Sequence, residues 1–232
     1  ISKILNEIKN NSADLNDKLI SLMNTINDSW AFRRYLSEYN TNTIDLSNII
    51  YNMKQHLKND NANLNSKDID FLLIGVNNSS YIRSSALLTT SVHDIKENKI
   101  TKISLKSPNK LLYQYSNSGF NSLTEHRNVI IATKVLKDQI TKKQYGMLYV
   151  SINENTFNKL YSDFTTKSND VVMISSDGTI VSSNKENIIG TIDKNLLNVA
   201  KLIDAKNLKF KNIKLNNKNY TILAEYMPIY NF

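Results

Sequence analysis

Five aromatic and cationic side chains are the ones best suited to bind a small molecule. Tyr81 and Arg83 are two positions apart in one short apolar run, and Tyr113 and Tyr115 have the same spacing in another. Residues two apart on a strand point to the same face. Tyrosine offers a flat ring with a polar tip, and arginine a planar fork that matches a carboxylate. With Arg127 at the start of a third run, these residues predict a ligand-binding sheet surface. A half-exposed, tyrosine-rich sheet face is the alternative interpretation.

Signatures of catalysis are missing from the sequence. It has no glycine-rich phosphate loop, no G-x-S-x-G nucleophile turn and no H-E-x-x-H zinc motif. His56, His93 and His126 are far apart, and the pair Asp68 and Asp70 is interpreted as a polar start to a strand. We therefore expect no enzymatic activity, no metal and no cofactor.

The composition is that of a basic, globular, cysteine-free protein. The 232 residues include 29 Lys and Arg against 21 Asp and Glu, which gives a net charge of +8, and 41% of them are hydrophobic. Only four of the cations are arginines, and the lysines are spread along the chain. A nucleic-acid-binding protein more often gathers Arg and Lys on one face. The charge thus indicates a solvated surface, and we expect no nucleic-acid partner.

The elements that must position these residues begin with a long helix. Apolar residues alternate at spacings of four and three along the first 26 residues, which is a heptad pattern. The pattern predicts a helix to about Tyr39, which packs on its own domain, forms a parallel dimer seam that continues a transmembrane helix, or does both. Both interpretations stay open. A second helix, capped by Thr43, should reach about Lys58. The seam comprises Ile1, Leu5, Ile8, Ser12, Leu15, Leu19, Leu22 and Ile26.

Short apolar runs then predict strands at 69–76, 80–86, 111–116, 128–136 and 145–152, with a helical or irregular crossover at 88–104. A linking helix follows from Asn153 or Asn155. A hairpin at 171–183 with an Asp177-Gly178 turn, a helix at 193–203 and strands at 207–215 and 219–227 complete the chain. The hairpins at 71–85 and 171–183 share one pattern, which indicates two related modules. The fold class is α+β with mainly antiparallel pairing.

Three segments carry a resemblance to a known family. Residues 128–136 and 145–154 resemble the end of the distal module in the extracellular double Cache (dCache) sensor domains of YesM-like bacterial sensor histidine kinases. The run Val-Met-Ile-Ser-Ser-Asp-Gly-Thr-Ile-Val-Ser-Ser at 172–183, with Ile-Ile-Gly at 188–190, resembles the start of their membrane-proximal module.

The resemblance implies a long N-terminal helix followed by two tandem PAS-like (Cache) modules with antiparallel sheets. The N-terminal helices would occupy 1–58, the membrane-distal module 59–152, a linker helix 153–167, and the membrane-proximal module, without its last strand, 168–232. The ligand would bind in the distal module, between its sheet and the covering helices. The Arg, Tyr, Trp and Asp pattern of amino-acid-binding members is not matched beyond Trp30 with Arg33 and Arg34, so an amino-acid ligand is not predicted.

The resemblance also implies a role. The chain would be the non-catalytic, extracellular ligand-sensing domain of a transmembrane two-component histidine kinase in a bacterial cell membrane. Its partners would be an unidentified small-molecule or peptide ligand, a second copy in a homodimer, and the membrane through flanking segments outside this chain. A ligand-binding domain of a methyl-accepting chemotaxis receptor is the first alternative, and a surface adhesion module is the second.

Overall fold

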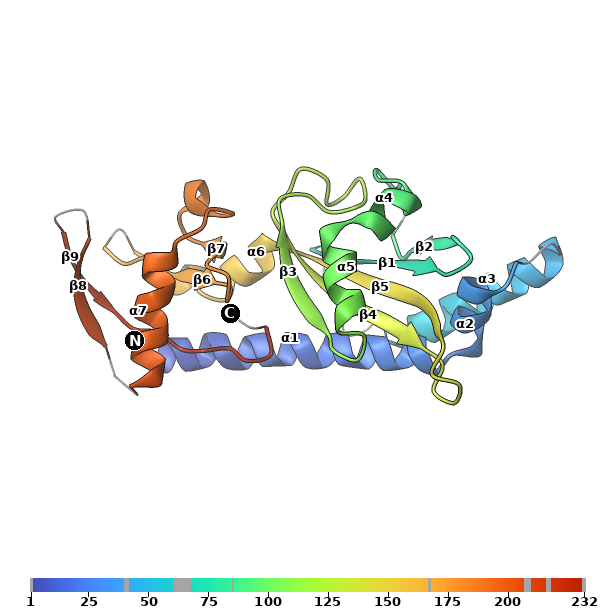
Figure 1. The fold of residues 1–232 in the computed structure, drawn as a ribbon, viewed down its shortest axis with the longest axis horizontal. Coiled ribbons are helices and arrows are strands. Elements are labelled where there is room, and N and C mark those ends of the chain that lie inside the picture. Colours follow the sequence, from blue (N-terminus) through green and yellow to red (C-terminus); the bar gives the residue numbers. More distant parts are fainter. Residues whose placement is uncertain are drawn as a thin grey trace. The chain divides into compact units, whose positions relative to one another are not determined.

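A computed structural model describes residues 2–39, 42–60, 68–84, 86–166, 168–206, 210–215 and 218–230 (Figure 1). The chain divides into two compact units. We call Asn16–Asn153 the sheet unit, and Ile1–Leu15 together with Glu154–Phe232 the terminal unit. The division falls inside the first helix, α1 (Ser2–Asp28).

The N-terminal helical region is broken where the sequence predicted one helix to Tyr39. Helix α1 ends at Asp28, Ser29 is extended (φ −84°, ψ 121°), and α2 runs over Trp30–Ser37. That prediction was wrong. Ser29-Trp30 contains neither Gly nor Pro, the residues that would signal a break. The break lets α2 bury Phe32 and Leu36 completely. Helix α3 (Thr43–Asp60) matches the second predicted helix, but Asn42 caps it in place of Thr43 through a 2.9 Å bond from the Ile44 amide.

The seam residues in the sheet unit are buried within this chain. Leu19 and Ile26 are 0% exposed and Leu22 is 2% exposed. The seam therefore packs on its own domain, which confirms the first of the two interpretations of the heptad pattern. A dimer contact through this part of α1 would need its other, polar face.

Five antiparallel strands form the sheet of the sheet unit, in the order β2-β1-β5-β4-β3. They are β1 (Ile69–Gly75), β2 (Ser80–Ile82), β3 (Leu112–Ser116), β4 (Val129–Lys137) and β5 (Gln144–Asn153). Four agree with the predicted ranges within a residue or two, and β2 is shorter than predicted. The crossover is helical, as α4 (Val92–Glu97) and α5 (Lys99–Lys106), which lie in front of the sheet in Figure 1.

The two faces of this sheet are both covered, which is why β1 and β5 read as nearly continuous apolar runs. Leu72, Met147 and Tyr149 pack with Ile95 and Ile100 of the covering helices on one face. The other face meets α2, whose Leu36 side chain lies 3.2 Å from the position a Cβ on Gly146 of β5 would take.

The terminal unit is built from short elements. They are α6 (Glu154–Asn158), two single-turn 3₁₀ helices (Ser162–Phe164 and Glu186–Ile188), the hairpin β6 (Val172–Ile174) and β7 (Ile180–Ser183), α7 (Lys194–Ala205), and the hairpin β8 (Lys211–Leu215) and β9 (Lys218–Ile222). The last predicted strand, 219–227, ends early at Ile222. Parts of the predicted strand 207–215 and of the turn after it, at 207–209 and 216–217, lie outside the described residues.

Three aromatic side chains form the centre of the terminal unit. Phe157, Tyr161 and Tyr230 are almost fully buried. The rings of Phe157 and Tyr230 meet edge to face at 5.7 Å, and the Tyr230 hydroxyl donates to the Ser12 carbonyl at 2.5 Å. These contacts tie the last described residues to the first turns of α1.

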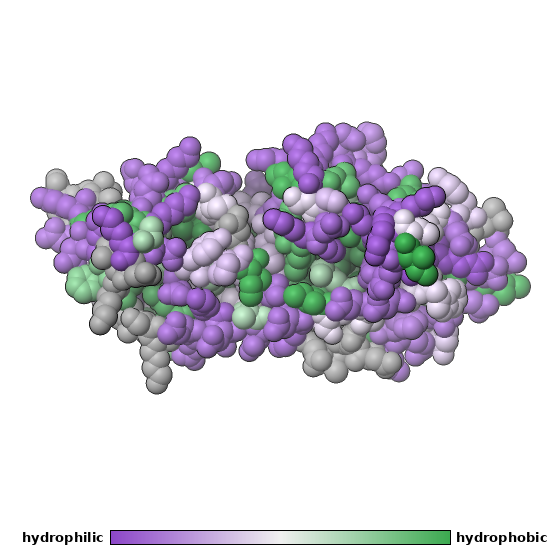
Figure 2. Space-filling model, turned by 60° about the horizontal axis from the view of Figure 1, so that its bottom comes forward, coloured by the Kyte–Doolittle hydropathy of each residue, from purple (hydrophilic) through white to green (hydrophobic). Residues whose placement is uncertain are grey.

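Hydrophilic side chains cover most of the surface seen in Figure 2, with hydrophobic ones in small separate groups. Within the described ranges, none of the helices combines the length and the apolar character that crossing a membrane requires.

Candidate functional site

The structure places the sequence-predicted binding residues in two separate groups. Tyr81 lies on β2, with Arg83 just after it, whereas Tyr113 and Tyr115 lie on β3. These strands are the opposite edges of the five-stranded sheet. Four strand spacings separate them, about 19 Å. The two groups do not line one small pocket.

The Tyr81 group is an aromatic cluster that holds β2 against α2. The Tyr81 ring meets Phe32 and Tyr35 edge to face, at 6.3 and 6.4 Å, and Phe71 at 6.3 Å. Burial raises the pKa of Tyr81, and the charge of the half-buried Arg83 opposes this rise. The Tyr35 hydroxyl donates to the Ser80 carbonyl at 2.8 Å. Packing accounts for the tyrosine side chains here.

In the second group, the tyrosine hydroxyls bond to asparagine side chains of the same unit. Tyr113 donates to Asn16 Oδ1 at 2.7 Å, and Tyr115 donates to Asn128 Oδ1 at 2.6 Å. Arg127 is exposed, just before β4. The assignment of all five residues to ligand binding stays a prediction.

Packed apolar side chains fill the space between the sheet and its covering helices, where the family resemblance placed the ligand. Buried hydroxyls there bond to each other, as Thr101 does to Tyr149 at 2.9 Å. The apolar cluster comprises Leu72, Ile74, Ile95, Ile100, Phe120, Val129, Ile131, Val135, Met147 and Tyr149.

A buried carboxylate lies beside this cluster. Asp70 is the second residue of β1, at the strand start as the sequence predicted, but it is buried, with 6% exposed. One of its oxygens accepts from Ser84 Oγ and from Asn121 Nδ2, both at 2.8 Å. The carboxylate thereby joins β1 to the segment after β2 and to the loop before β4, and its bonds give it a structural role.

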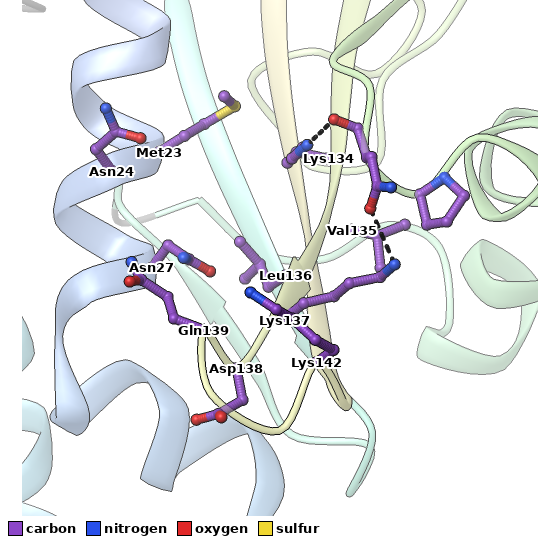
Figure 3. A pocket seen from close by; sticks show the side chains of 12 residues that line it. Met23, Asn24, Asn27, Lys134, Val135, Leu136, Lys137, Asp138, Gln139 and Lys142 are labelled. Carbon is purple, nitrogen blue, oxygen red and sulfur yellow. Dashed lines mark hydrogen bonds between the residues drawn. The ribbon is translucent and has the colours of Figure 1, made fainter.

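A cleft of about 300 Å³ lies in the sheet unit where the end of β4 faces α1 and the loop after α5 (Figure 3). Sequence reasoning did not predict it, because its lysines were interpreted as solvated. We call this the β4 cleft. Its lining combines apolar, amide and charged side chains: Met23, Asn24, Asn27, Pro108, Asn109, Lys134, Val135, Leu136, Lys137, Asp138, Gln139 and Lys142.

Lysines make the β4 cleft electropositive. Lys134 donates to the Asn109 carbonyl, and Lys137 donates to Asn109 Oδ1 at 3.1 Å, both drawn as dashed lines in Figure 3. Burial, with the nearby charge of Lys137, lowers the pKa of Lys134. Asp138 is the acidic residue of the lining, and it pairs with Arg33 at 2.6 Å.

No protein-family model matches the chain, and no curated protein matches it in sequence.

Solved structures do resemble it. The ligand-binding domain of the Campylobacter jejuni chemoreceptor Tlp3 in complex with L-norvaline has a TM-score of 0.63 at 20% identity, covering 98% of this chain and 85% of that one. The L-valine complex of the same domain has a TM-score of 0.58 at 22% identity, covering 94% and 84%. The ligand-binding domain of the Pseudomonas aeruginosa PAO1 amino acid chemoreceptor PctB with L-Arg has a TM-score of 0.59 at 10% identity, covering 95% and 79%. The chain therefore has the fold of chemoreceptor ligand-binding domains.

Proposed function

We propose that this chain is the ligand-sensing domain of a transmembrane receptor, exposed on the outer side of a bacterial membrane and without catalytic activity of its own. The observation that carries the proposal is the likeness to the Tlp3 domain over 98% of this chain. The mixed α+β architecture, with a long N-terminal helix and antiparallel sheets, agrees with it.

A chemoreceptor parent is favoured over a histidine kinase. The solved structures described above are domains of chemoreceptors. The sequence-based preference for a YesM-like kinase has no such support. Membrane-spanning segments in the rest of the receptor, and a second copy in a homodimer, belong to this proposal.

Each unit would have its own role. The sheet unit would be the membrane-distal, ligand-binding module, corresponding to the predicted 59–152, and the terminal unit would contain the membrane-proximal module, predicted at 168–232. Ligand binding would shift the population between two conformations of the receptor, which requires different affinities for the two.

The ligand would be a small molecule. The similar structures hold L-norvaline, L-valine and L-Arg, so aliphatic and basic amino acids belong in the first panel beside organic acids, sugars, amines and short peptides. Three surfaces are proposed to bind the ligand. Two are the sheet edges, one with Tyr81 and Arg83, the other with Tyr113, Tyr115 and Arg127. The third is the β4 cleft.

The test is a thermal-shift screen of the isolated chain. A ligand that binds only the folded state, at about 100 times its Kd, should raise the melting temperature by about 5–10 °C. The shift should saturate with concentration. A panel in which no class of compound shifts the melting temperature would contradict the proposal, and would favour an adhesion module that needs no pocket.

A further inference from the structure

The β4 cleft exists because β4 extends beyond its neighbour. Pairing between β3 and β4 begins with Leu112 opposite Thr133, so the end of β4 lies past the start of β3. The loop after α5 supplies Pro108 and Asn109 there, and α1 supplies Met23 and Asn27. Three segments distant in sequence thus form one hollow in the sheet unit.

A β-bulge in the sheet shapes the wall on the α1 side. The pairing of β4 with β5 shifts after Leu136 opposite Gly146, and Tyr145 is passed over. Strict alternation would place Tyr145 on the face of Met147 and Tyr149, under α4 and α5. Instead its hydroxyl reaches α1 and donates to Asn27 Oδ1 at 3.2 Å. A bulge redirects a side chain in this way. With Oδ1 already accepting from Tyr145, the Asn27 amide has its NH₂ group to offer as a donor.

Positive charge gathers on the β4 side of the cleft. Lys134 and Lys137 converge on the single residue Asn109, and Lys142 adds a third ammonium group to the lining. Each ammonium has three donors, so the bonds to Asn109 leave donors over. Lys134 is partly buried, and a second ammonium close by is unfavourable for it.

The one carboxylate in the lining is held by other groups. Asp138 accepts at one oxygen from Arg33 at 2.6 Å, and at the other from the Ile140 and Thr141 amides and the Thr141 hydroxyl. Its side chain is 15% exposed. Hydrogen bonds from Thr141 are the main cause that lowers the pKa of Asp138, so it stays ionised and bound to Arg33.

The remaining lining is apolar or neutral. Met23, Val135, Leu136 and Pro108 supply carbon surface beside the amides. A ligand that suits this lining has an acidic group for the lysines, a short apolar body for the carbon surface, and polar atoms for the amides. The volume of about 300 Å³ is at the small end of ligand sites.

We propose that the β4 cleft binds a small organic acid, with a carboxylate between Lys134 and Lys137 and a short carbon chain against Met23 and Leu136. A dicarboxylate of four carbons matches the lining best, because Lys142 and the Asn27 amide are available for its second carboxylate. An α-amino acid fits less well, because its ammonium group would face the lysines. The inference deepens the proposed function and rests on it, since a ligand cleft contributes to signalling only in a sensor.

The experiment titrates the chain with succinate, L-valine and inorganic phosphate at matched ionic strength, by calorimetry and thermal shift. The variants are Lys134→Gln and Lys137→Gln. Lys143→Gln is the matched control, because Lys143 is exposed in the same β4–β5 connection but does not line the cleft. Melting of each variant without ligand checks its fold. If Lys134→Gln is unstable, Lys137→Gln alone tests the cleft, because Lys137 lies nearer the end of the strand.

Succinate should bind saturably, phosphate and L-valine more weakly. Loss of a charged hydrogen bond should weaken succinate binding by about tenfold or more in each cleft variant, while Lys143→Gln should keep the wild-type Kd. Equal affinity for succinate and phosphate, unchanged by the cleft variants, would mean an adventitious ion only and would overturn the proposal. If L-valine binds and succinate does not, the cleft proposal fails and the sensor function stands. If none of the three binds, the cleft proposal fails, and the sensor function fails as well only if the full thermal-shift panel also produces no shift.

Discussion

The hairpins β1–β2 and β6–β7 close with the same hydrogen bonds in different surroundings. In the first, the Gly75 amide donates to the Ser79 carbonyl at 2.9 Å. In the second, the Ser175 amide donates to the Thr179 carbonyl at 2.9 Å. The equivalence is exact in sequence spacing, since each pair is four residues apart.

The side chains of the two turns also correspond. Asn77 Oδ1 accepts from the amide two residues on at 3.0 Å, and Asp177 Oδ1 does the same at 3.0 Å. The next residue has a positive φ in both turns, Asn78 at 65° and Gly178 at 92°. Asn and Gly are the residues that tolerate this conformation best. The local turn is therefore encoded by the same chemistry twice.

Tertiary contacts differ at the first turn position. A Cβ on Gly75 would lie 2.3 Å from the Leu36 carbonyl oxygen, so α2 approaches too closely for any side chain. The second hairpin carries Ser175 at this position, and its hydroxyl bonds to Asp177 at 2.5 Å. Turn chemistry thus fixes the shape of a hairpin, while packing against other elements decides which positions must stay small.

Exchanging the residues at the first turn position should have the largest consequence for stability. Gly75→Ser gives the first hairpin the residue of the second, and the clash with a backbone carbonyl should destabilise the sheet unit by about 3 kcal/mol. Ser175→Gly makes the reverse exchange and should cost only about 1 kcal/mol, for the lost hydroxyl bond. Hydrogen exchange resolved by peptide measures each unit by itself. Equal losses in the two variants would contradict the role assigned to Leu36.

The open ends of the two hairpins give the next comparison. Asp70 joins the first to Ser84 and Asn121 through a buried carboxylate. In the second, the neutral Asn184 side chain accepts from the Val171 amide at 2.8 Å. Asp70→Ala should cost about 2–3 kcal/mol, since a charged acceptor is lost and buried donors stay unpaired. Asn184→Ala should cost about 1 kcal/mol. Urea unfolding, together with hydrogen exchange resolved by peptide, would measure the loss of stability in each variant. A smaller loss for Asp70→Ala than for Asn184→Ala would contradict the structural role of the Asp70 carboxylate.

A carboxyl group beside the second hairpin gives the smallest effect, and it depends on pH. Burial is the main cause that raises the pKa of Glu154 above 4.5, although Ser182 donates to it at 2.5 Å. A raised pKa in the folded state favours the protonated form. The contribution of Glu154 is thus fully present below pH 4.5 and is lost as the pH rises through the raised value.

Glu154→Gln should therefore stabilise the terminal unit at neutral pH relative to wild type, with the difference shrinking towards pH 4. Thermal melts of the two proteins across this range measure it. The difference between variants is the readout, because Asp138 and Glu97 have lowered pKa values and act in the opposite direction. A stability difference that does not change with pH would show that burial is not the cause.

Local signals sufficed for much of the fold. The strands of the sheet unit follow from their apolar runs, and the Asp177-Gly178 turn follows from its residue types, because both depend on neighbours in sequence. The break at Ser29 was not predicted, because neither Gly nor Pro marks it in the sequence and the burial of Phe32 and Leu36 that accompanies it is a tertiary feature.

The β4 cleft was equally out of reach of sequence reasoning. It needs three distant segments and a bulge that turns Tyr145 away from the face its position predicts. In the sequence nothing distinguishes Lys134 and Lys137 from solvated lysines, because only the fold brings the loop with Asn109 beside them. Spacing pairs Tyr81 with Arg83 and Tyr113 with Tyr115, but it does not reveal strand order, which places the two pairs at opposite edges of the sheet.

The most direct measurement of the central claim, that a ligand is sensed in the sheet unit, is hydrogen exchange of the whole chain with and without saturating succinate. If the β4 cleft holds the ligand, amide exchange should slow at 107–110 and 134–142 and stay unchanged in the hairpin at 172–183. Slowing confined to 172–183, or unchanged exchange at 134–142 while succinate is bound, would contradict it.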